Sequence, residues 1–159
     1  MNNKLKLLTV FSFFGVCCLI FTGLIGAGSA SAASCYGGSC TGKDPRATGC
    51  SADARTIDRV IANGRQWQLR YSPSCDATWG RMLRPSVQGD TVNLDGIPPE
   101  SKYEPYTFST TFPSHQVWPG PQWTMMGAHR DKTRVCGRYG TPSPGGGSDT
   151  SKWYCSEWH

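Results

Sequence analysis

The segment ANGRQWQLRY, residues 62–71, decides the fold class. Its Asn63-Gly64 pair is the strongest short-range signal for a two-residue β-hairpin turn. Polar and apolar residues alternate after the turn, with Trp67, Leu69 and Tyr71 on one face, which is the period of a half-buried strand. The arm before the turn fits either a second strand or a short helix that ends at the Asn-Gly pair.

Short segments of strand-like composition continue to the end of the chain, separated by glycine and proline. They are Ala77–Leu83, Thr91–Leu94, Tyr106–Phe112, Gln122–Gly127, Arg134–Tyr139 and Ser151–Trp158. Within this series, Pro119-Gly120 suits a type II turn. Many short strands with frequent turn residues predict a mainly β fold, a small disulfide-stapled barrel or sandwich with Gly/Pro-rich loops.

The N-terminus has the three parts of an export signal. A basic start is followed by an apolar run and by the small residues Ala30-Ser31-Ala32, which fit the A-x-A cleavage pattern. A retained membrane anchor is the alternative, but glycine, serine and threonine interrupt the apolar run. We therefore expect a cleaved signal peptide at residues 1–32 and a single secreted, disulfide-rich domain at residues 33–159, with no stable membrane anchor.

Eight cysteines occur in the chain, and two of them, Cys17 and Cys18, lie within the signal. The other six are Cys35, Cys40, Cys50, Cys75, Cys136 and Cys155. An even number of cysteines in an exported chain predicts a disulfide framework rather than a metal or redox site. The simplest pair joins Cys136 to Cys155 across the Gly-rich loop between them. The other four cysteines allow three pairings, which the sequence does not separate.

The segment LRYSPSCDATW, residues 69–79, is either a nucleophile loop or a stapled turn. A nucleophilic Cys75 would need a reduced thiol with a lowered pKa, whereas an exported chain with several other cysteines favours pairing. Pro73 presets a turn, and serines in turns commonly bond to local backbone. We therefore expect a scaffold role for this segment, with Cys75 tying the turn to the N-terminal loop.

Composition argues against several function classes. The full chain carries a net charge of +5, and loss of Lys4 and Lys6 with the signal leaves +3, without any run of basic residues. A nucleic-acid partner is therefore not expected. The chain has no H-E-x-x-H zinc motif, and we expect no metal and no cofactor. The histidines His115, His129 and His159 lie in no recognisable catalytic motif, so no catalytic residue is assigned.

Exposed tryptophans are the first group of candidate binding residues. Trp118 and Trp123 bracket a rigid Pro-Gly-Pro turn, and Trp153 and Trp158 crowd the C-terminus. Tryptophans on a rigid frame make good stacking surfaces for sugars, peptides or lipid headgroups. In a chain of this size most tryptophans belong to the core, which is the alternative for these four residues and our expectation for Trp67 and Trp79.

Arg70 is the remaining candidate binding residue, and it has two interpretations. Near Asp44, Asp53 or Asp58, it would form a structural ion pair. In a concave aromatic site, its guanidinium group would hold an anionic ligand.

Three cysteine motifs resemble a known family. They are C-Y-x-x-S-C at residues 35–40, G-C-x-x-D-A at residues 49–54 and R-Y-S-x-x-C-x-x-x-W at residues 70–79. Together they resemble the YjfA-like family of small exported bacterial proteins, which is classed as a domain of unknown function. The resemblance covers about the first half of the mature chain. It implies export from Gram-positive-type bacteria and a compact disulfide-bonded domain, and it suits an extracellular binding or sensing module better than an enzyme.

These observations predict a secreted, monomeric, non-catalytic binding module at or near the cell envelope. Its expected partner is the cell wall or another extracellular polymer. Two alternatives stay open. One is a small secreted hydrolase of wall or polymer substrates, and the other is a secreted antagonist, a bacteriocin or a protease inhibitor.

Overall fold

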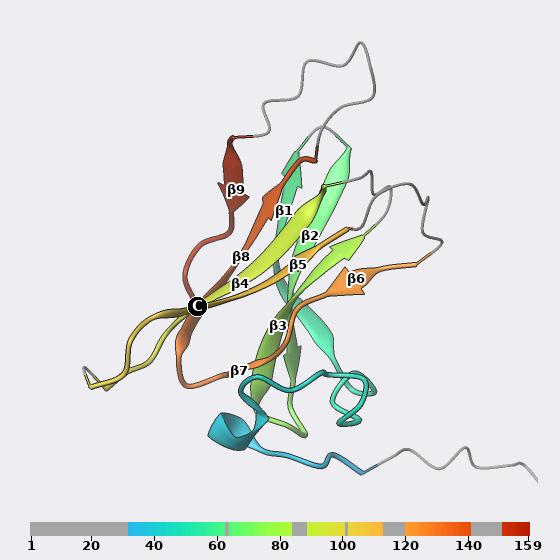
Figure 1. Cartoon of the computed structure of the whole chain (residues 1–159). Coiled ribbons are helices and arrows are strands. Elements are labelled where there is room, and N and C mark those ends of the chain that lie inside the picture. Colours follow the sequence, from blue (N-terminus) through green and yellow to red (C-terminus); the bar gives the residue numbers. More distant parts are fainter. Residues whose placement is uncertain (1–31, 63, 84–88, 101, 113–119, 141–150) are drawn as a thin grey trace, which may run out of the picture.

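The described part of the protein consists of two antiparallel β-sheets, packed as a sandwich, and one short 3-10 helix (Figure 1). The computed structural model describes residues 32–62, 64–83, 89–100, 102–112, 120–140 and 151–159. No α-helix occurs in these ranges, and no helix there is long and apolar enough to cross a membrane. The mainly β, disulfide-stapled fold is confirmed. The expected signal peptide lies outside the described residues, except for Ala32.

The first sheet grows from the predicted hairpin. Its strands are β1 (Arg55–Ala62), β2 (Arg65–Ser72), β3 (Ala77–Leu83) and β6 (Gln122–Trp123), in that order, while β7 (Gly127–Ala128) pairs with the start of β3. Gly64 has a φ of 76°, which is the left-handed backbone that a two-residue hairpin turn requires. The arm before the turn is a strand, so the helical alternative is wrong.

The second sheet has the order β5-β4-β8-β9. Its strands are β4 (Thr91–Ile97), β5 (Tyr106–Thr111), β8 (Lys132–Arg138) and β9 (Trp153–Cys155). Val92 and Leu94 are fully buried. Because side chains alternate along a strand, Asn93 and Asp95 lie on the opposite, outer face of this sheet.

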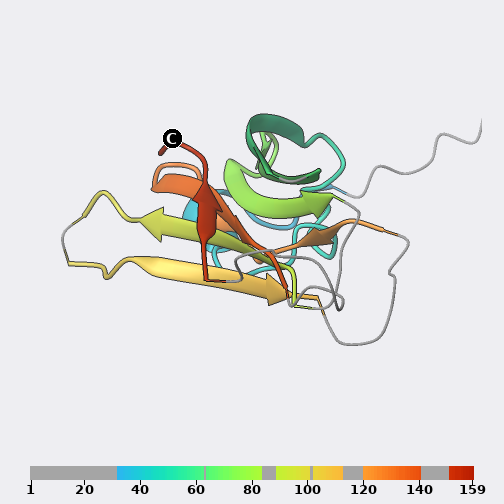
Figure 2. The same cartoon turned by 90° about the horizontal axis from the view of Figure 1, so that it is seen from above.

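The main core lies between the two sheets, which Figure 2 shows as two layers. Its buried residues are Trp67, Leu69, Met82, Val92, Leu94, Phe112, Val135 and Tyr139. The largest of them, Trp67, comes from β2, where sequence alternation placed it in the core. Its indole fits against the bare backbone of β8, since a Cβ atom at Gly137 would lie 2.0 Å from the Trp67 ring.

A second, smaller cluster lies between the N-terminal loop, residues 33–54, and the outer face of the first sheet. Its buried residues are Cys35, Cys40, Cys50, Cys75, Ala77, Trp79 and Met126. The loop carries the 3-10 helix η1 (Gly37–Cys40). Backbone hydrogen bonds from Gly42 N to Met126 O and from Met126 N to Lys43 O fix the loop to the segment between β6 and β7. This pairing outside the sheet divides the predicted Gln122–Gly127 strand in two.

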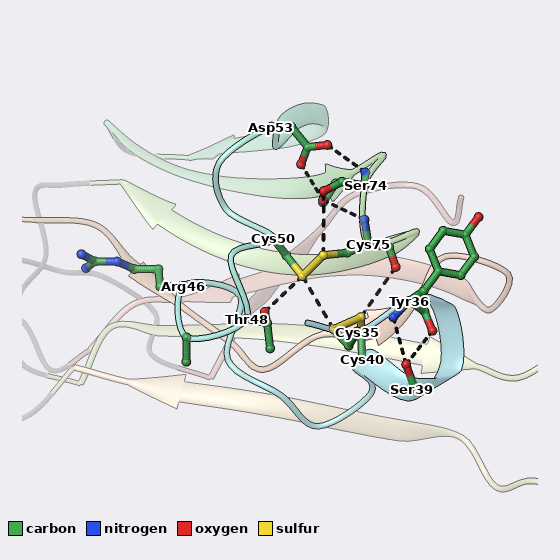
Figure 3. Close-up of a disulfide and its surroundings, with 12 residues drawn as sticks. Cys35, Tyr36, Ser39, Cys40, Arg46, Thr48, Cys50, Asp53, Ser74 and Cys75 are labelled. Atoms are coloured by element: carbon green, nitrogen blue, oxygen red, sulfur yellow. Dashed lines mark hydrogen bonds between the residues drawn. A yellow bond between two sulfur atoms is a disulfide. The ribbon is translucent and has the colours of Figure 1, made fainter. Parts of the chain in front are cut away.

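Three disulfides staple the sandwich: Cys35–Cys40, Cys50–Cys75 and Cys136–Cys155. The last is the pair predicted from the Gly-rich loop, and it joins directly opposed residues of β8 and β9. The first two lie side by side where the N-terminal loop packs on the first sheet, with 3.7 Å between the Sγ atoms of Cys35 and Cys50 (Figure 3). They select one of the three pairings that the sequence left open.

The segment from Ser72 to Asp76 is a stapled turn, as expected. Cys75 is bonded to Cys50, so it has no thiol. The Ser72 hydroxyl donates to Asp53 Oδ1 at 2.6 Å and accepts from the Cys75 amide at 3.2 Å. The Ser74 amide donates to Asp53 Oδ2 at 2.8 Å (Figure 3). The turn therefore holds the N-terminal loop through a disulfide and a carboxylate together.

Candidate binding site

A pocket of about 270 Å³ lies between the N-terminal loop and the outer face of the first sheet. Its lining residues are Pro45, Arg46, Ser51, Arg70, Trp79, Arg81, Pro121 and Trp123. We call this the arginine pocket, because three of its eight lining residues are arginines and none is acidic. Concave sites with aromatic walls and a few convergent polar groups are the usual form of small-molecule sites.

Strand pairing brings the wall of the arginine pocket together. Arg70 of β2 lies opposite Trp79 of β3, and Arg81 of β3 lies between Gln68 of β2 and Trp123 of β6. These two cross-strand rows are adjacent on one face of the sheet, because side chains two residues apart along a strand point the same way. Residues separated by more than fifty positions in the sequence thus form one continuous surface.

Arg70 is held by β1 and by the end of the N-terminal loop, but no carboxylate neutralises it among the described residues. Its Nη1 donates to the Thr56 hydroxyl at 2.7 Å, and its Nη2 donates to the Ala54 carbonyl oxygen. Its Nε is buried and has no hydrogen-bond partner among the residues that the structure describes. Burial lowers the pKa of the Arg70 guanidinium, and the nearby charge of Arg81 lowers it further. The proposed ion pair with an aspartate is absent among the described residues, whereas the concave aromatic setting is present.

On the same wall, the guanidinium group of Arg81 is hydrogen-bonded to the uncharged side chain of Gln68. The Arg81 Nε donates to Gln68 Oε1 at 3.0 Å, and its Nη2 donates to the same oxygen. Burial lowers the pKa of Arg81 as well. An amide oxygen orients the guanidinium without cancelling its charge. Within the described ranges, neither Arg70 nor Arg81 forms an ion pair with a carboxylate, so the wall keeps a net positive charge.

Trp123 joins the N-terminal loop to the sheet. Its indole Nε1 donates to Asp44 Oδ2 at 2.9 Å, and the Arg46 guanidinium lies 4.9 Å from the centre of its ring. Burial by itself raises the pKa of Asp44, but hydrogen bonds from Trp123 and from backbone amides, with the charge of Arg46, outweigh it and lower the pKa. The ring is therefore fixed at both its edge and its face. Arg46 extends away from the disulfides (Figure 3).

The other predicted tryptophans lie elsewhere. Trp153 and Trp158 are each more than a third exposed and lie against Arg138 and Arg134, respectively, on the second sheet. Trp118 lies outside the described residues, as does the Pro119 half of the predicted turn.

The two described histidines have partners but lie in different places. The His129 ring packs against the Tyr71 ring, with 4.2 Å between the ring centres, and His159 Nε2 lies 2.8 Å from Asp58 Oδ2. In the ranges given above, neither imidazole is hydrogen-bonded to a serine, threonine or cysteine side chain. His115 lies outside those ranges.

Four sulfur atoms have the spacing of a metal site. The Sγ atoms of Cys35, Cys40, Cys50 and Cys75 all lie within 4.8 Å of one another and are buried. Zinc binds thiolates, but these atoms are bonded in two disulfides and offer none. In the oxidised protein they form a structural cluster.

Comparison with known proteins adds one finding. Residues 38–111 match the model of a family described as a protein of unknown function (DUF2690). The matched region begins within η1, ends with β5 and includes Arg46, Arg70, Trp79 and Arg81, while Trp123 lies beyond it. No curated protein and no solved structure matches the chain.

Sequence reasoning identified Arg70 and Trp123 of this pocket but missed Arg46 and Arg81. Trp79 was assigned to the core, and it is 3% exposed while still lining the pocket. No local signal singles out Arg46, because its position depends on how the disulfides fold the loop over the sheet. Arg81 had no signal either, because the residues on its face of the strand, Ala77, Trp79 and Leu83, are apolar.

Proposed function

We propose that this protein is a secreted, monomeric, non-catalytic binding module whose arginine pocket holds an anionic group of a cell-envelope polymer. The observation that carries the proposal is the convergence of Arg46, Arg70 and Arg81 beside two tryptophans, with no acidic residue in the lining. Guanidinium groups bind carboxylate and phosphate with paired, directional hydrogen bonds. Tryptophan rings pack against the uncharged part of the same ligand.

The electrostatics of the wall support an anion rather than a neutral ligand. Burying a charged group without a counter-charge is unfavourable, yet Arg70 and Arg81 are both partly buried and form no ion pair in the described part of the chain. An incoming anion relieves their repulsion. The Nε of Arg70 is a further unused donor, because it is buried and has no hydrogen-bond partner in the described part of the chain.

Two features of the chain, its N-terminal composition and its disulfides, support the proposed extracellular location. The N-terminal residues have the composition of an export signal, and three disulfides are typical of an oxidising environment. The cysteine motifs resemble the YjfA-like family, which supports export from a Gram-positive-type cell. Walls of such cells carry anionic polymers, the class of ligand that the pocket suits.

Co-sedimentation with isolated Gram-positive cell walls tests the proposal. Purified, oxidised protein is mixed with intact walls, and with walls stripped of their anionic polymers, across a salt series. We expect saturable binding to intact walls that weakens with salt and is lost on stripped walls. No sedimentation at any salt concentration would refute the proposal. Release of wall fragments would favour the hydrolase, and inhibition of growth or of proteases at low concentration would favour the antagonist.

Matched variants separate the pocket from general charge attraction. Arg46→Gln removes one positive charge from the pocket. Arg59→Gln removes one positive charge from an exposed position of β1 that does not line the pocket. A charge-assisted hydrogen bond is worth about 1.5–3 kcal/mol, so Arg46→Gln is expected to weaken binding about tenfold or more. Arg59→Gln should change it less than about twofold. Equal losses in both variants would show that net charge, not the pocket, drives binding.

A further inference from the structure

The outer face of the second sheet carries a second concave site, on the side away from the main core. This outer trough has a volume of about 310 Å³ and is lined by Asn93, Asp95, Arg134, Cys136, Trp153 and Cys155. It shares no residue with the arginine pocket. Its lining includes hydrogen-bond acceptors, a hydrogen-bond donor and an aromatic ring.

Asn93 is the unexplained residue of the outer trough. It is 9% exposed, and its Oδ1 is buried without a hydrogen-bond partner in the described ranges of the chain. Buried side-chain acceptors almost always have a donor, from the protein or from ordered water. Its neighbours across the sheet are Ser109 and Cys136, and neither donates to it. A ligand hydroxyl that lies in the trough would replace water as the donor to this oxygen.

Asp95 and Arg134 form an oriented pair beside Asn93. The Arg134 Nε lies 3.0 Å from Asp95 Oδ2, and the Thr107 hydroxyl donates to Asp95 Oδ1 at 2.9 Å. The Arg134 guanidinium also lies 4.4 Å from the centre of the Trp158 ring. Within the described residues, the Nη groups of Arg134 donate to no protein acceptor. The pair therefore presents donors and acceptors next to each other, an arrangement that suits vicinal hydroxyl groups.

Trp153 forms an aromatic platform at the edge of the trough. It is 38% exposed, and the Arg138 guanidinium lies 4.9 Å from the centre of its ring. Arg138 and Trp153 are opposed residues of β8 and β9, and the neighbouring opposed pair on the same face is the disulfide Cys136–Cys155. The disulfide holds a strand of only three residues in register, so the ring is positioned before any ligand binds.

We infer that the outer trough binds a sugar unit of a neutral glycan chain. A pyranose ring presents C–H groups that pack on Trp153 and hydroxyl groups that both donate and accept. The hydroxyls match Asn93 as acceptor and the Asp95–Arg134 pair as acceptor and donor. The internal pairing of Arg134 with Asp95 makes this site unsuited to an anion, in contrast with the arginine pocket.

Binding to neutral polysaccharides tests this inference. The oxidised protein is sedimented with chitin and with cellulose, and titrated with soluble chito-oligosaccharide while tryptophan fluorescence is followed. We expect binding to at least one of these probes, with little dependence on salt. Trp153→Ala should weaken it about tenfold, Trp153→Phe should restore most of it, and Tyr103→Ala, which removes an exposed aromatic residue elsewhere, should not affect it. Absence of binding to every probe, or unchanged affinity in Trp153→Ala, would overturn the inference.

A second variant separates ligand binding from folding. Asn93→Val removes the unpartnered acceptor and suits a strand, so the melting temperature should stay level or rise while glycan affinity falls at least about fivefold. A fall in melting temperature with unchanged affinity would assign Asn93 a structural role and contradict the site. Arg46→Gln should leave glycan binding unchanged, so failure of the arginine pocket and failure of the outer trough are distinguishable.

Discussion

Arg81 of β3 and Trp123 of β6 are opposed residues in an antiparallel ladder, and both line the wall of the arginine pocket. Arg46 of the N-terminal loop lies against the Trp123 ring, 4.9 Å from its centre. The pocket thus depends on contacts between segments far apart in the sequence.

Arg70→Lys should reduce both stability and ligand binding. A single ammonium group cannot replace a guanidinium group that donates to Thr56 and Ala54 and also faces the pocket. We expect a loss of about 1–2 kcal/mol in the free energy of unfolding, measured by urea titration, and weaker sedimentation with walls. A lysine variant that matches the wild type in both measurements would contradict the assigned role.

Trp123→Phe tests the indole hydrogen bond to Asp44. The substitution keeps an aromatic ring but removes the Nε1 donor, which lies 2.9 Å from Asp44 Oδ2. We expect the free energy of unfolding to fall by about 1 kcal/mol. The pKa of Asp44 should rise, because that hydrogen bond helps to lower it, and carboxyl NMR titration measures the shift. An unchanged pKa would mean that other contacts hold this carboxylate.

The three disulfides should contribute unequally to stability. The closed loops have sequence separations of 25 for Cys50–Cys75, 19 for Cys136–Cys155 and 5 for Cys35–Cys40. In the chain-entropy model these loops stabilise by about 3.5, about 3 and about 2 kcal/mol, respectively. Paired Cys→Ser variants, unfolded in urea, check this order, and the largest loss from Cys35–Cys40 would contradict it.

Asp53→Asn should remove stability that depends on pH. Burial by itself raises the pKa of Asp53, but hydrogen bonds from Ser72 and Ser74 outweigh it and lower the pKa below its ordinary value of 3.8. Because the folded pKa is the lower one, this stabilisation is present above the unfolded value and is lost as pH falls through the folded value. The variant should be about 1 kcal/mol less stable at neutral pH.

The gap between wild type and Asp53→Asn should therefore close on acidification below about pH 4. Thermal unfolding followed from neutral to acid pH measures it. A gap that stays constant across that range would show that the carboxylate charge does not contribute.

Much of the scaffold was predictable because its signals are local. The Asn63-Gly64 turn and the alternation after it gave the hairpin, and the Gly-rich loop gave the Cys136–Cys155 pair. The pairing among the four remaining cysteines was not predictable, since it depends on how the N-terminal loop folds over β3. The place of Arg46 in the pocket was not predictable for the same reason. Trp153 and Trp158 were candidate binding residues from their place near the C-terminus, but Asn93, which lines the same trough as Trp153, has no signal in the sequence.

An NMR titration of the ¹⁵N-labelled protein with poly(glycerol phosphate), a phosphodiester polymer, shows directly whether the arginine pocket binds an anion. It follows the Nε–H signals of arginines and the indole Nε1–H signals of tryptophans as the polymer is added. We predict that the signals of Arg70, Arg81 and Trp123 shift together and saturate, while that of Arg59 does not move. Equal small shifts at all arginines, or no shift at these three residues, would contradict an anion-binding arginine pocket.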